Sequence, residues 1–216
     1  MKKLFIESIK KFIFNFTPFG APAYSYNLEP IQLSEIIVSI EKIKNIKGSI
    51  CEIGVARGMT SRFICEHLKN QNYKEKFYCI DTFVSFEKED IDFEIQNRKK
   101  NKKELVGFGY NNFDKWKKNF INFDFVQPIK VDIKKFDFNS ISPVKLVILD
   151  VDLYKPTLIA LNNLKKNMVA GGIIIVDDVK NNNSWDGAHQ AFYEFVKSNS
   201  YTYKVIGNKC GVIHFL

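Results

Sequence analysis

The 216-residue sequence lacks several features that mark particular classes of protein. No apolar run approaches the roughly 18 residues that a membrane-spanning helix needs, so we expect no transmembrane segment. Residues 1–16 combine lysines with apolar side chains, but no small-residue cleavage site follows, so a secretory signal peptide is not predicted. No heptad repeat is sustained and only 11 glycines are present, which excludes coiled-coil and collagen-like architectures.

Cysteine and histidine are scarce, with four and three copies. The cysteines at positions 51, 65, 79 and 210 form no C-x-x-C pair, and none lies at metal-ligand spacing from a histidine. Cys51 and Cys79 fall in apolar runs that are typical of core strands. We therefore expect buried, reduced thiols in a cytoplasmic protein.

Apolar residues make up 45% of the chain and charged residues 26%, as in an ordinary globular protein. This predicts one domain with a substantial core rather than a disordered chain. Lysine and arginine outnumber aspartate and glutamate by 32 to 24, a net charge of +8. The excess favours an anionic partner such as nucleic acid, a nucleotide-linked molecule or a membrane surface. Abundant Lys, Asn, Ile and Phe also match the composition of AT-rich genomes, so charge alone does not choose among these partners.

Apolar periodicity predicts helices that alternate with strands over most of the chain. Such alternation is typical of a parallel sheet with right-handed crossovers. The last two strands, joined by a tight turn at Gly207 and Asn208, are expected to form an antiparallel hairpin at one sheet edge. The expected strands are residues 49–54, 76–82, 123–131, 145–150, 172–178, 201–206 and 211–215, and the expected helices are residues 3–15, 31–46, 60–69, 156–166 and 188–197.

We expect two parts in the chain: N-terminal helices with a lid loop over residues 1–47, and the main domain over residues 48–216. The helix at 3–15 has apolar residues at helical spacing between lysines. It either packs on the domain or on a second subunit, or lies on a membrane surface. The segment 84–122 is too long for a plain strand-to-helix loop. Its acidic first half and basic second half form either a solvated charged face or an insertion that recognises an anionic substrate.

A glycine-containing loop follows the first strand of the predicted sheet. Glu52, Gly54 and Gly58 lie in the stretch CEIGVARG, which opens the next helix. Glycine permits close approach of the backbone to a ligand, and a helix N-terminus presents unpaired N–H groups. Asp81 ends the next strand, where an acid accepts hydrogen bonds from ribose hydroxyls. Together these residues favour a site for a nucleoside-containing cofactor, although the G-x-x-x-G spacing differs from a dinucleotide fingerprint.

Four aspartates follow two neighbouring strands of the predicted sheet. Asp150 and Asp152 come after one strand, and Asp177 and Asp178 end the next. Because the carboxyl ends of parallel strands meet at the same edge, we expect the four side chains to converge. Crowded carboxylates repel one another, so they take up protons unless a cation holds them. Oxygen ligands without histidine or cysteine favour a hard divalent ion such as Mg²⁺.

These motifs resemble those of class I S-adenosylmethionine-dependent methyltransferases, and in particular the macrocin O-methyltransferase-like family, whose members methylate sugar hydroxyls of macrolide and aminocoumarin antibiotics. The resemblance rests on the stretches CEIGVARGMTS, IDTFVSF, LVILDVDLYKPTLIALNNL, VAGGIIIVDDV and WDGAHQAFYEF, between about residues 48 and 197. It implies a Rossmann-like α/β methyltransferase fold, with a seven-stranded mostly parallel sheet, an antiparallel C-terminal hairpin strand and helices on both faces.

The resemblance also implies how the cofactor, S-adenosylmethionine (SAM), is held. Gly54 and Gly58 would shape the turn around its methionine part, with Glu52 beneath that turn. Asp81 would hold the ribose, and Asp132, after the third strand, would contact the adenine. Tyr24 and Tyr26, in the loop after the first helix, either close over the cofactor or pack on the core.

For catalysis, the resemblance implies that Asp150, Asp177 and Asp178 bind Mg²⁺ and that Asp152 is the general base. The metal would lower the pKa of the acceptor hydroxyl, and the oxygen would attack the sulfonium methyl group in line. His189 departs from the family, whose members often carry arginine there, and Trp185 either packs or lines the acceptor pocket.

We therefore expect an O-methyltransferase, a homodimer by resemblance, that acts on a small acceptor such as a sugar or nucleotide sugar. A nucleic-acid methyltransferase is one alternative, but the chain has neither an N/D-P-P-Y/F motif nor a catalytic cysteine motif, so we expect no nucleic-acid partner. A NAD-dependent oxidoreductase is a second, against which the glycine spacing and the paired aspartates argue. A membrane-surface protein that binds through residues 1–16 is a third.

Overall fold

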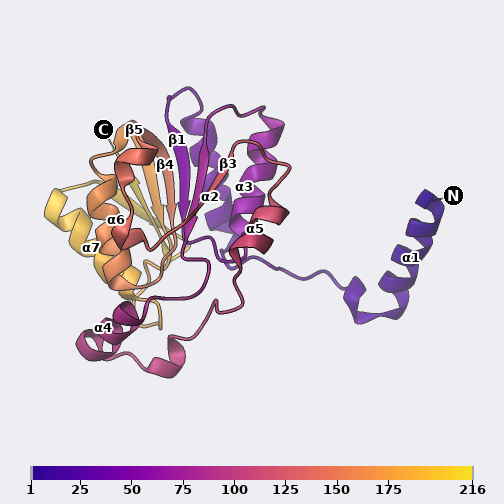
Figure 1. Cartoon of the computed structure of the whole chain (residues 1–216), viewed down its shortest axis with the longest axis horizontal. Coiled ribbons are helices and arrows are strands. Elements are labelled where there is room, and N and C mark those ends of the chain that lie inside the picture. Colours follow the sequence, from indigo (N-terminus) through magenta and orange to yellow (C-terminus); the bar gives the residue numbers. More distant parts are fainter. Residues whose placement is uncertain (1, 216) are drawn as a thin grey trace.

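Residues 2–215, which the computed structural model describes, build an α/β fold around one seven-stranded sheet (Figure 1). The strand order is β3-β2-β1-β4-β5-β7-β6. Neighbouring strands are parallel from β3 to β5, whereas β7 is antiparallel to both β5 and β6. The strands are β1 (Ser49–Ile53), β2 (Phe77–Asp81), β3 (Val126–Lys130), β4 (Val144–Leu149), β5 (Met168–Val176), β6 (Tyr203–Ile206) and β7 (Cys210–His214).

The central strands and the final turn follow directly from their residues. Every residue of β1 and β4 is buried, as expected for parallel strands that are covered on both faces. Gly207 and Asn208 have φ values of +57° and +63°, the left-handed values that a two-residue hairpin turn favours. The predicted mostly parallel sheet and its antiparallel C-terminal hairpin are therefore confirmed.

Helices cover both faces of the sheet, as predicted (Figure 1). One core cluster contains side chains of α2, α3 and α5 together with Ile50, and the other contains side chains of α6 and α7 together with Cys51. The alternation along β1 thus sends neighbouring residues to opposite layers. The helices are α1 (Lys2–Phe16), α2 (Pro30–Lys42), α3 (Met59–Asn70), α4 (Lys88–Arg98), α5 (Phe113–Asn119), α6 (Tyr154–Leu164) and α7 (Gly187–Asn199).

The segment 84–122 folds into α4, a short 3₁₀ turn and α5. Trp116 of α5 is buried in the core cluster that α2 and α3 share. On α4, the acidic side chains of Asp90 and Glu94 are buried as well, although the segment reads as strongly charged. The segment is therefore anchored at both of its helices and is more than a solvated face.

The N-terminal helix forms as predicted but lies away from the sheet and its covering helices (Figure 1). All residues of α1 are exposed, and an extended stretch connects its end with α2. Within residues 2–215, no helix combines the length and the apolar character that crossing a membrane requires.

Candidate active site

A cavity of about 330 Å³ opens at the carboxyl ends of the central strands. In parallel α/β sheets this edge is where ligands bind, because loops and helix N-termini meet there. Gly58 is the one predicted site residue that does not line this cavity in the part of the chain that the structure describes. The other eight all do: Glu52, Gly54, Asp81, Asp132, Asp150, Asp152, Asp177 and Asp178.

Both glycines of the loop after β1 have left-handed backbone conformations, for different steric reasons. Gly54 has a φ of +85°, and a Cβ atom there would lie 1.7 Å from the carbonyl oxygen of Asp150. It therefore lets the loop pass directly beside the end of β4. Gly58 has a φ of +88°, and a Cβ atom there would lie 2.7 Å from Nε1 of Trp116 and 2.8 Å from Phe120. The space at Gly58 is thus used by aromatic side chains of α5.

Asp81 organises the loop that carries these glycines. Its Oδ2 accepts hydrogen bonds from the backbone N–H groups of Val55 and Ala56, at 2.8 and 3.0 Å. Its Oδ1 accepts from the N–H of Phe83 at 2.6 Å and from the Thr82 hydroxyl at 3.4 Å. Each carboxylate oxygen thus accepts two hydrogen bonds, of which the one from the Thr82 hydroxyl is the longest.

Glu52 is the buried acid beneath the loop. Burial raises the pKa of Glu52 from its ordinary value of 4.5 to about 8, and the nearby charge of Asp81 acts in the same direction. Its Oε2 atom is buried and has no hydrogen-bond partner within residues 2–215. An unpartnered buried oxygen beside a cavity is costly, and a ligand that donates a hydrogen bond would satisfy it.

Asp132 belongs to a second charged group at the edge of the cavity. Its Oδ1 accepts a hydrogen bond from the N–H of Lys134 at 3.0 Å, and its Oδ2 lies 3.3 Å from the Lys134 ammonium. The same ammonium contacts Asp90, a cavity-lining acid of α4 that sequence reasoning missed. Burial raises the pKa of Asp90. No motif singled out Asp90, and the sequence of α4 has no amphipathic pattern that could have placed it on an inner face.

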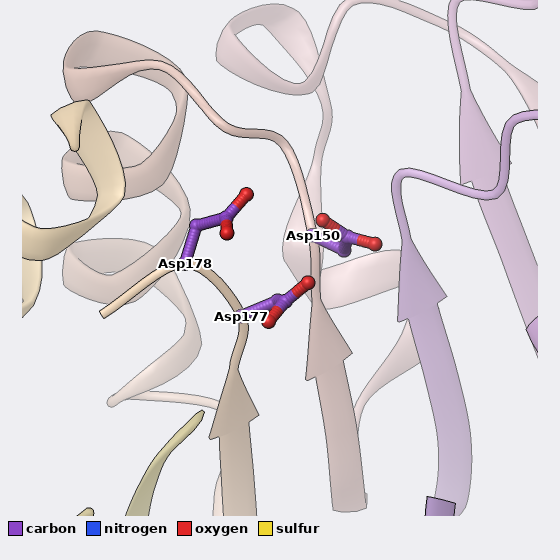
Figure 2. Close-up of side chains that lie close together, drawn as sticks. All are labelled: Asp150, Asp177 and Asp178. Carbon is purple, nitrogen blue, oxygen red and sulfur yellow. The ribbon is translucent and has the colours of Figure 1, made fainter. Parts of the chain in front are cut away.

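Three aspartates converge beyond β4 and β5 (Figure 2). Asp150, Asp177 and Asp178 each offer a carboxylate oxygen within 4.8 Å of the other two. Burial raises the pKa of Asp150 and of Asp177, and the charge of a neighbouring aspartate adds to both shifts. Such mutual repulsion is the electrostatic condition that a divalent cation relieves.

Asp152 lies beside this cluster in the loop before α6. It is buried, and its φ of +61° is unusual for a residue with a side chain. Its carbonyl oxygen accepts a hydrogen bond from the N–H of Ala188 at 2.9 Å, which ties the loop to α7. Burial raises the pKa of Asp152, and the nearby charge of Asp178 raises it further. Strained backbone that neighbouring elements hold in place is common at active sites.

Two polar partners of the aspartates were not found from the sequence. The Lys209 ammonium lies 3.2 Å from Oδ2 of Asp177 and 3.1 Å from Oδ1 of Asp178. Gln32 of α2 donates a hydrogen bond from Nε2 to Oδ1 of Asp177 at 2.6 Å. The predicted hairpin could have pointed to Lys209, because it precedes the strand that pairs with β5. Gln32 carries no comparable signal, since its position depends on how α2 packs.

Aromatic side chains line the cavity near these acids. The ring centroid of Phe86 is 5.3 Å from that of Trp185 and 5.4 Å from that of Phe108. All three residues line the cavity, and Trp185 both packs against Phe86 and lines this cavity. Tyr26 instead packs edge-on against Phe63 of α3, and neither it nor Tyr24 lines the cavity within the described chain.

A buried ionic network joins α4 to the loops that carry these residues. Glu94 accepts hydrogen bonds from the N–H of Tyr154 at 2.7 Å and from Nε of Arg98 at 2.6 Å. The Arg98 guanidinium also contacts Asp186, and the Lys100 ammonium lies 2.6 Å from the same aspartate. Because Tyr154 begins α6 just after Asp152, the network links α4 to the edge of the sheet that lines the cavity.

The chain is similar in fold to several solved methyltransferases. The O-methyltransferase NovP superposes with a TM-score of 0.67, at 19% identity over 85% of this chain and 79% of NovP. The calicheamicin methyltransferase CalS11, described in another structure as a TDP-rhamnose 3'-O-methyltransferase, superposes with a TM-score of 0.68, at 14% identity over 99% of this chain and 92% of CalS11. A putative methyltransferase from Streptococcus mutans in complex with SAH has a TM-score of 0.53, at 16% identity over 88% of this chain and all of that one. The fold is therefore that of a Rossmann-like methyltransferase.

The family follows from the sequence itself. A family model for macrocin-O-methyltransferase (TylF) matches residues 30–207, and the chain belongs to this family. No curated protein matches the chain significantly. The protein is accordingly an enzyme, an S-adenosylmethionine-dependent O-methyltransferase.

Proposed function

We propose that this enzyme methylates a hydroxyl of a sugar or another small polar metabolite and that Mg²⁺ assists the transfer. The carrying observation is the convergence of four buried or half-buried aspartates on the cavity that the glycine loop also lines. Methyl transfer from SAM to oxygen needs a deprotonated acceptor and an aligned donor rather than a covalent enzyme intermediate. Four acids beside one cavity supply both a metal site and a base.

The residues present fit both groups. Oxygen donors within 4.8 Å of one another suit a hard divalent cation, which Asp150, Asp177 and Asp178 would hold. Glu52, with its unpartnered Oε2, and Asp81, which lines the same cavity beside the glycine loop, would hold SAM. Asp132 remains our proposed neighbour of the adenine. When bound, SAM supplies an electrophilic methyl group, and Mg²⁺ supplies a Lewis acid that lowers the pKa of the acceptor hydroxyl.

Asp152 is our proposed general base. Its raised pKa makes it a stronger proton acceptor than an exposed carboxylate once it is ionised. The acceptor proton would pass to Asp152 as the acceptor oxygen forms its bond to the methyl carbon and the carbon–sulfur bond breaks. The hydrogen bond from Ala188 to the backbone of Asp152 holds this side chain at the cavity.

The aromatic cluster supports a sugar as acceptor. Phe86, Phe108 and Trp185 offer apolar ring faces, against which the C–H face of a pyranose packs, while the nearby aspartates accept from its hydroxyls. The description of CalS11 as a nucleotide-sugar methyltransferase favours the same substrate class. We further propose that the segment 84–122, which carries Phe86 and Phe108, selects the acceptor.

Three broader features complete the proposal. We keep residues 1–47 as an N-terminal part that precedes the main domain over 48–216. A homodimer is proposed from the family alone. A cytoplasmic location is proposed because all four cysteines are buried free thiols.

Calorimetric titration and methyl transfer together test this function. SAM should bind the wild-type enzyme, and Asp81→Asn should weaken it at least tenfold. Mg²⁺ titrated after EDTA treatment should bind the wild type but not Asp177→Asn. The exposed substitution Asp124→Asn is the matched control for both titrations. Labelled methyl groups should then reach nucleotide sugars or glycosides only when Mg²⁺ is present. Full turnover in EDTA, or transfer to RNA instead, would contradict the proposal.

A further inference from the structure

The N-terminal helix carries a continuous apolar side that covers nothing in the described fold. At 100° per residue, Phe5, Ile9, Phe12 and Phe16 lie on one side of α1, at spacings of four, three and four residues. Phe5, Phe12 and Phe16 are 68%, 59% and 74% exposed. Large contiguous apolar surfaces of this kind mark interaction sites, because they are unfavourable in water.

The charges on the same helix have one predominant sign. Lys2, Lys3, Lys10 and Lys11 stand against a single acid, Glu7, which pairs with Lys10 at 2.8 Å. The helix therefore carries a net charge of +3, in a chain whose net charge is +8. An aromatic apolar side flanked by lysines is the composition of helices that lie in the interface of anionic membranes.

We propose that α1 binds the surface of an anionic phospholipid membrane, with its axis parallel to the membrane plane. With 15 residues the helix is about 22 Å long, too short to cross the roughly 30 Å apolar core of a bilayer. The main competing occupant is a second copy of the chain. Pairing two such helices would bring two sets of lysines together, whereas anionic headgroups complement them.

The position of α1 gives this binding a consequence for the enzyme. Arg57, in the glycine loop, donates a hydrogen bond to the carbonyl oxygen of Ser25 at 3.0 Å, and Asn27 lines the cavity. The residues 17–26 between α1 and Asn27 span at most about 35 Å when fully extended. A membrane-bound α1 would therefore keep the cavity within that distance of the headgroups. This inference does not depend on which acceptor is methylated.

Co-sedimentation of the full-length chain with vesicles tests the proposal. The wild type should bind vesicles of phosphatidylcholine with 30% phosphatidylglycerol at least tenfold more strongly than pure phosphatidylcholine vesicles at about 0.1 M salt. Phe5→Ser with Phe12→Ser should reduce this binding at least tenfold. Leu4→Ser with Phe14→Ser is the matched control, because both residues are similarly exposed but lie about 100° and 180° around α1 from Phe5. This control should bind within twofold of the wild type.

Three results would overturn the proposal. One is equal binding to anionic and neutral vesicles, and another is an equal loss of binding in both double variants. The third is the absence of vesicle binding together with a dimer that depends on Phe5 and Phe12. Light scattering without lipid would then show that the dimer dissociates only in the Phe5→Ser/Phe12→Ser variant. All α1 residues are exposed, so the melting temperature of each variant should equal that of the wild type.

Discussion

At the scale of single residues, the four aspartates that line the cavity differ because their neighbours differ. Asp177 accepts from Gln32 and contacts Lys209, so positive and polar groups already compensate its charge. Asp152 instead has Asp178 as its charged neighbour, which disfavours its ionised form. Burial raises the pKa of both side chains, but only Asp177 has a hydrogen-bond donor and an ammonium in contact that oppose the shift.

The proposed general-base role of Asp152 predicts a specific kinetic effect for Asp152→Asn. The amide retains the size of the side chain but cannot take up the acceptor proton. We expect kcat to fall by about 10² to 10⁴, while calorimetry shows SAM affinity within threefold of the wild type. Asp124→Asn, on the exposed surface, should leave both quantities unchanged. Turnover of Asp152→Asn near the wild-type rate would rule out this assignment.

Glu52 predicts a dependence of stability on pH. Its folded pKa of about 8 exceeds the roughly 4.3 of an unfolded chain. The stabilising contribution of Glu52 is therefore fully present at pH values below its pKa in the unfolded chain. It is lost as the pH rises through the pKa of the folded protein. Glu52→Gln keeps a neutral side chain at both pH values. We therefore expect the free energy of unfolding of the variant, minus that of the wild type, to be several kcal/mol larger at pH 8.5 than at pH 5.

Urea unfolding of both proteins at the two pH values measures this difference. The contribution of the buried aspartates to the pH dependence cancels in this comparison, because they titrate in the wild type and in the variant alike. A difference between the two proteins that is the same at pH 5 and pH 8.5 would show that Glu52 is ionised in the folded state.

Trp185 predicts a separation between acceptor and cofactor binding. It packs against Phe86 at the cavity, so Trp185→Ala should raise the KM for a sugar acceptor at least tenfold. The calorimetric affinity for SAM should stay within threefold. Phe19→Ala, in the exposed 3₁₀ turn Pro18–Gly20 after α1, serves as the aromatic control. If SAM affinity falls together with acceptor affinity, Trp185 supports the site as a whole rather than the acceptor.

At the scale of elements, local patterns predicted the existence of the helices and strands better than their ends. The second helix ends at Lys42 rather than residue 46, because Ile43 leaves helical geometry with φ −101° and ψ 9°. The third strand begins at Val126, since the N–H of Val126 closes a turn onto the carbonyl of Phe123. Both residues are buried and apolar, so hydrophobicity alone could not distinguish turn from element.

The segment 84–122 shows what such patterns cannot predict. The partners of Glu94 are Tyr154, on α6, and Arg98, which in turn contacts Asp186 before α7. This pairing depends on how three elements meet in space and leaves no periodic signal in α4. The four aspartates were predictable because parallel topology alone brings strand ends together, whereas Lys209 and Gln32 needed the packing of the hairpin and of α2.

The network predicts that Glu94→Gln destabilises the fold. The amide oxygen can still accept the hydrogen bond from Tyr154, but the substitution removes the buried negative charge beside Arg98. We expect the free energy of unfolding to fall by about 3 kcal/mol. Glu66→Gln is the matched control, because Glu66 also pairs with an arginine four residues away but both side chains are half exposed. Its cost should be below about 1 kcal/mol. Equal costs in chemical denaturation would mean that burial adds nothing to the Glu94 pair.

At the scale of the whole molecule, one sheet connects both core layers to the site. Strand residues alternate between the two layers, and the loops at the carboxyl ends of all five parallel strands, β1 to β5, contribute to the cavity. The alternation of helices and strands in the sequence was enough to predict this architecture. The expected buried free thiols are also present, since all four cysteines are buried and none is paired within residues 2–215.

These thiols test whether the sheet and both layers unfold as one unit. Cys51 lies in one core layer, and Cys65, Cys79 and Cys210 lie in the other. Burial raises the pKa of each thiol, so a reagent that needs the thiolate reacts only after opening. We expect all four to react at one common rate with the same urea dependence, measured by mass spectrometry of labelled peptides, because each requires global unfolding.

A thiol introduced as Ser8→Cys on exposed α1 should react at once in the native protein. If Cys210 reacts at lower urea than Cys51, then the C-terminal hairpin opens separately and the sheet is not a single cooperative unit.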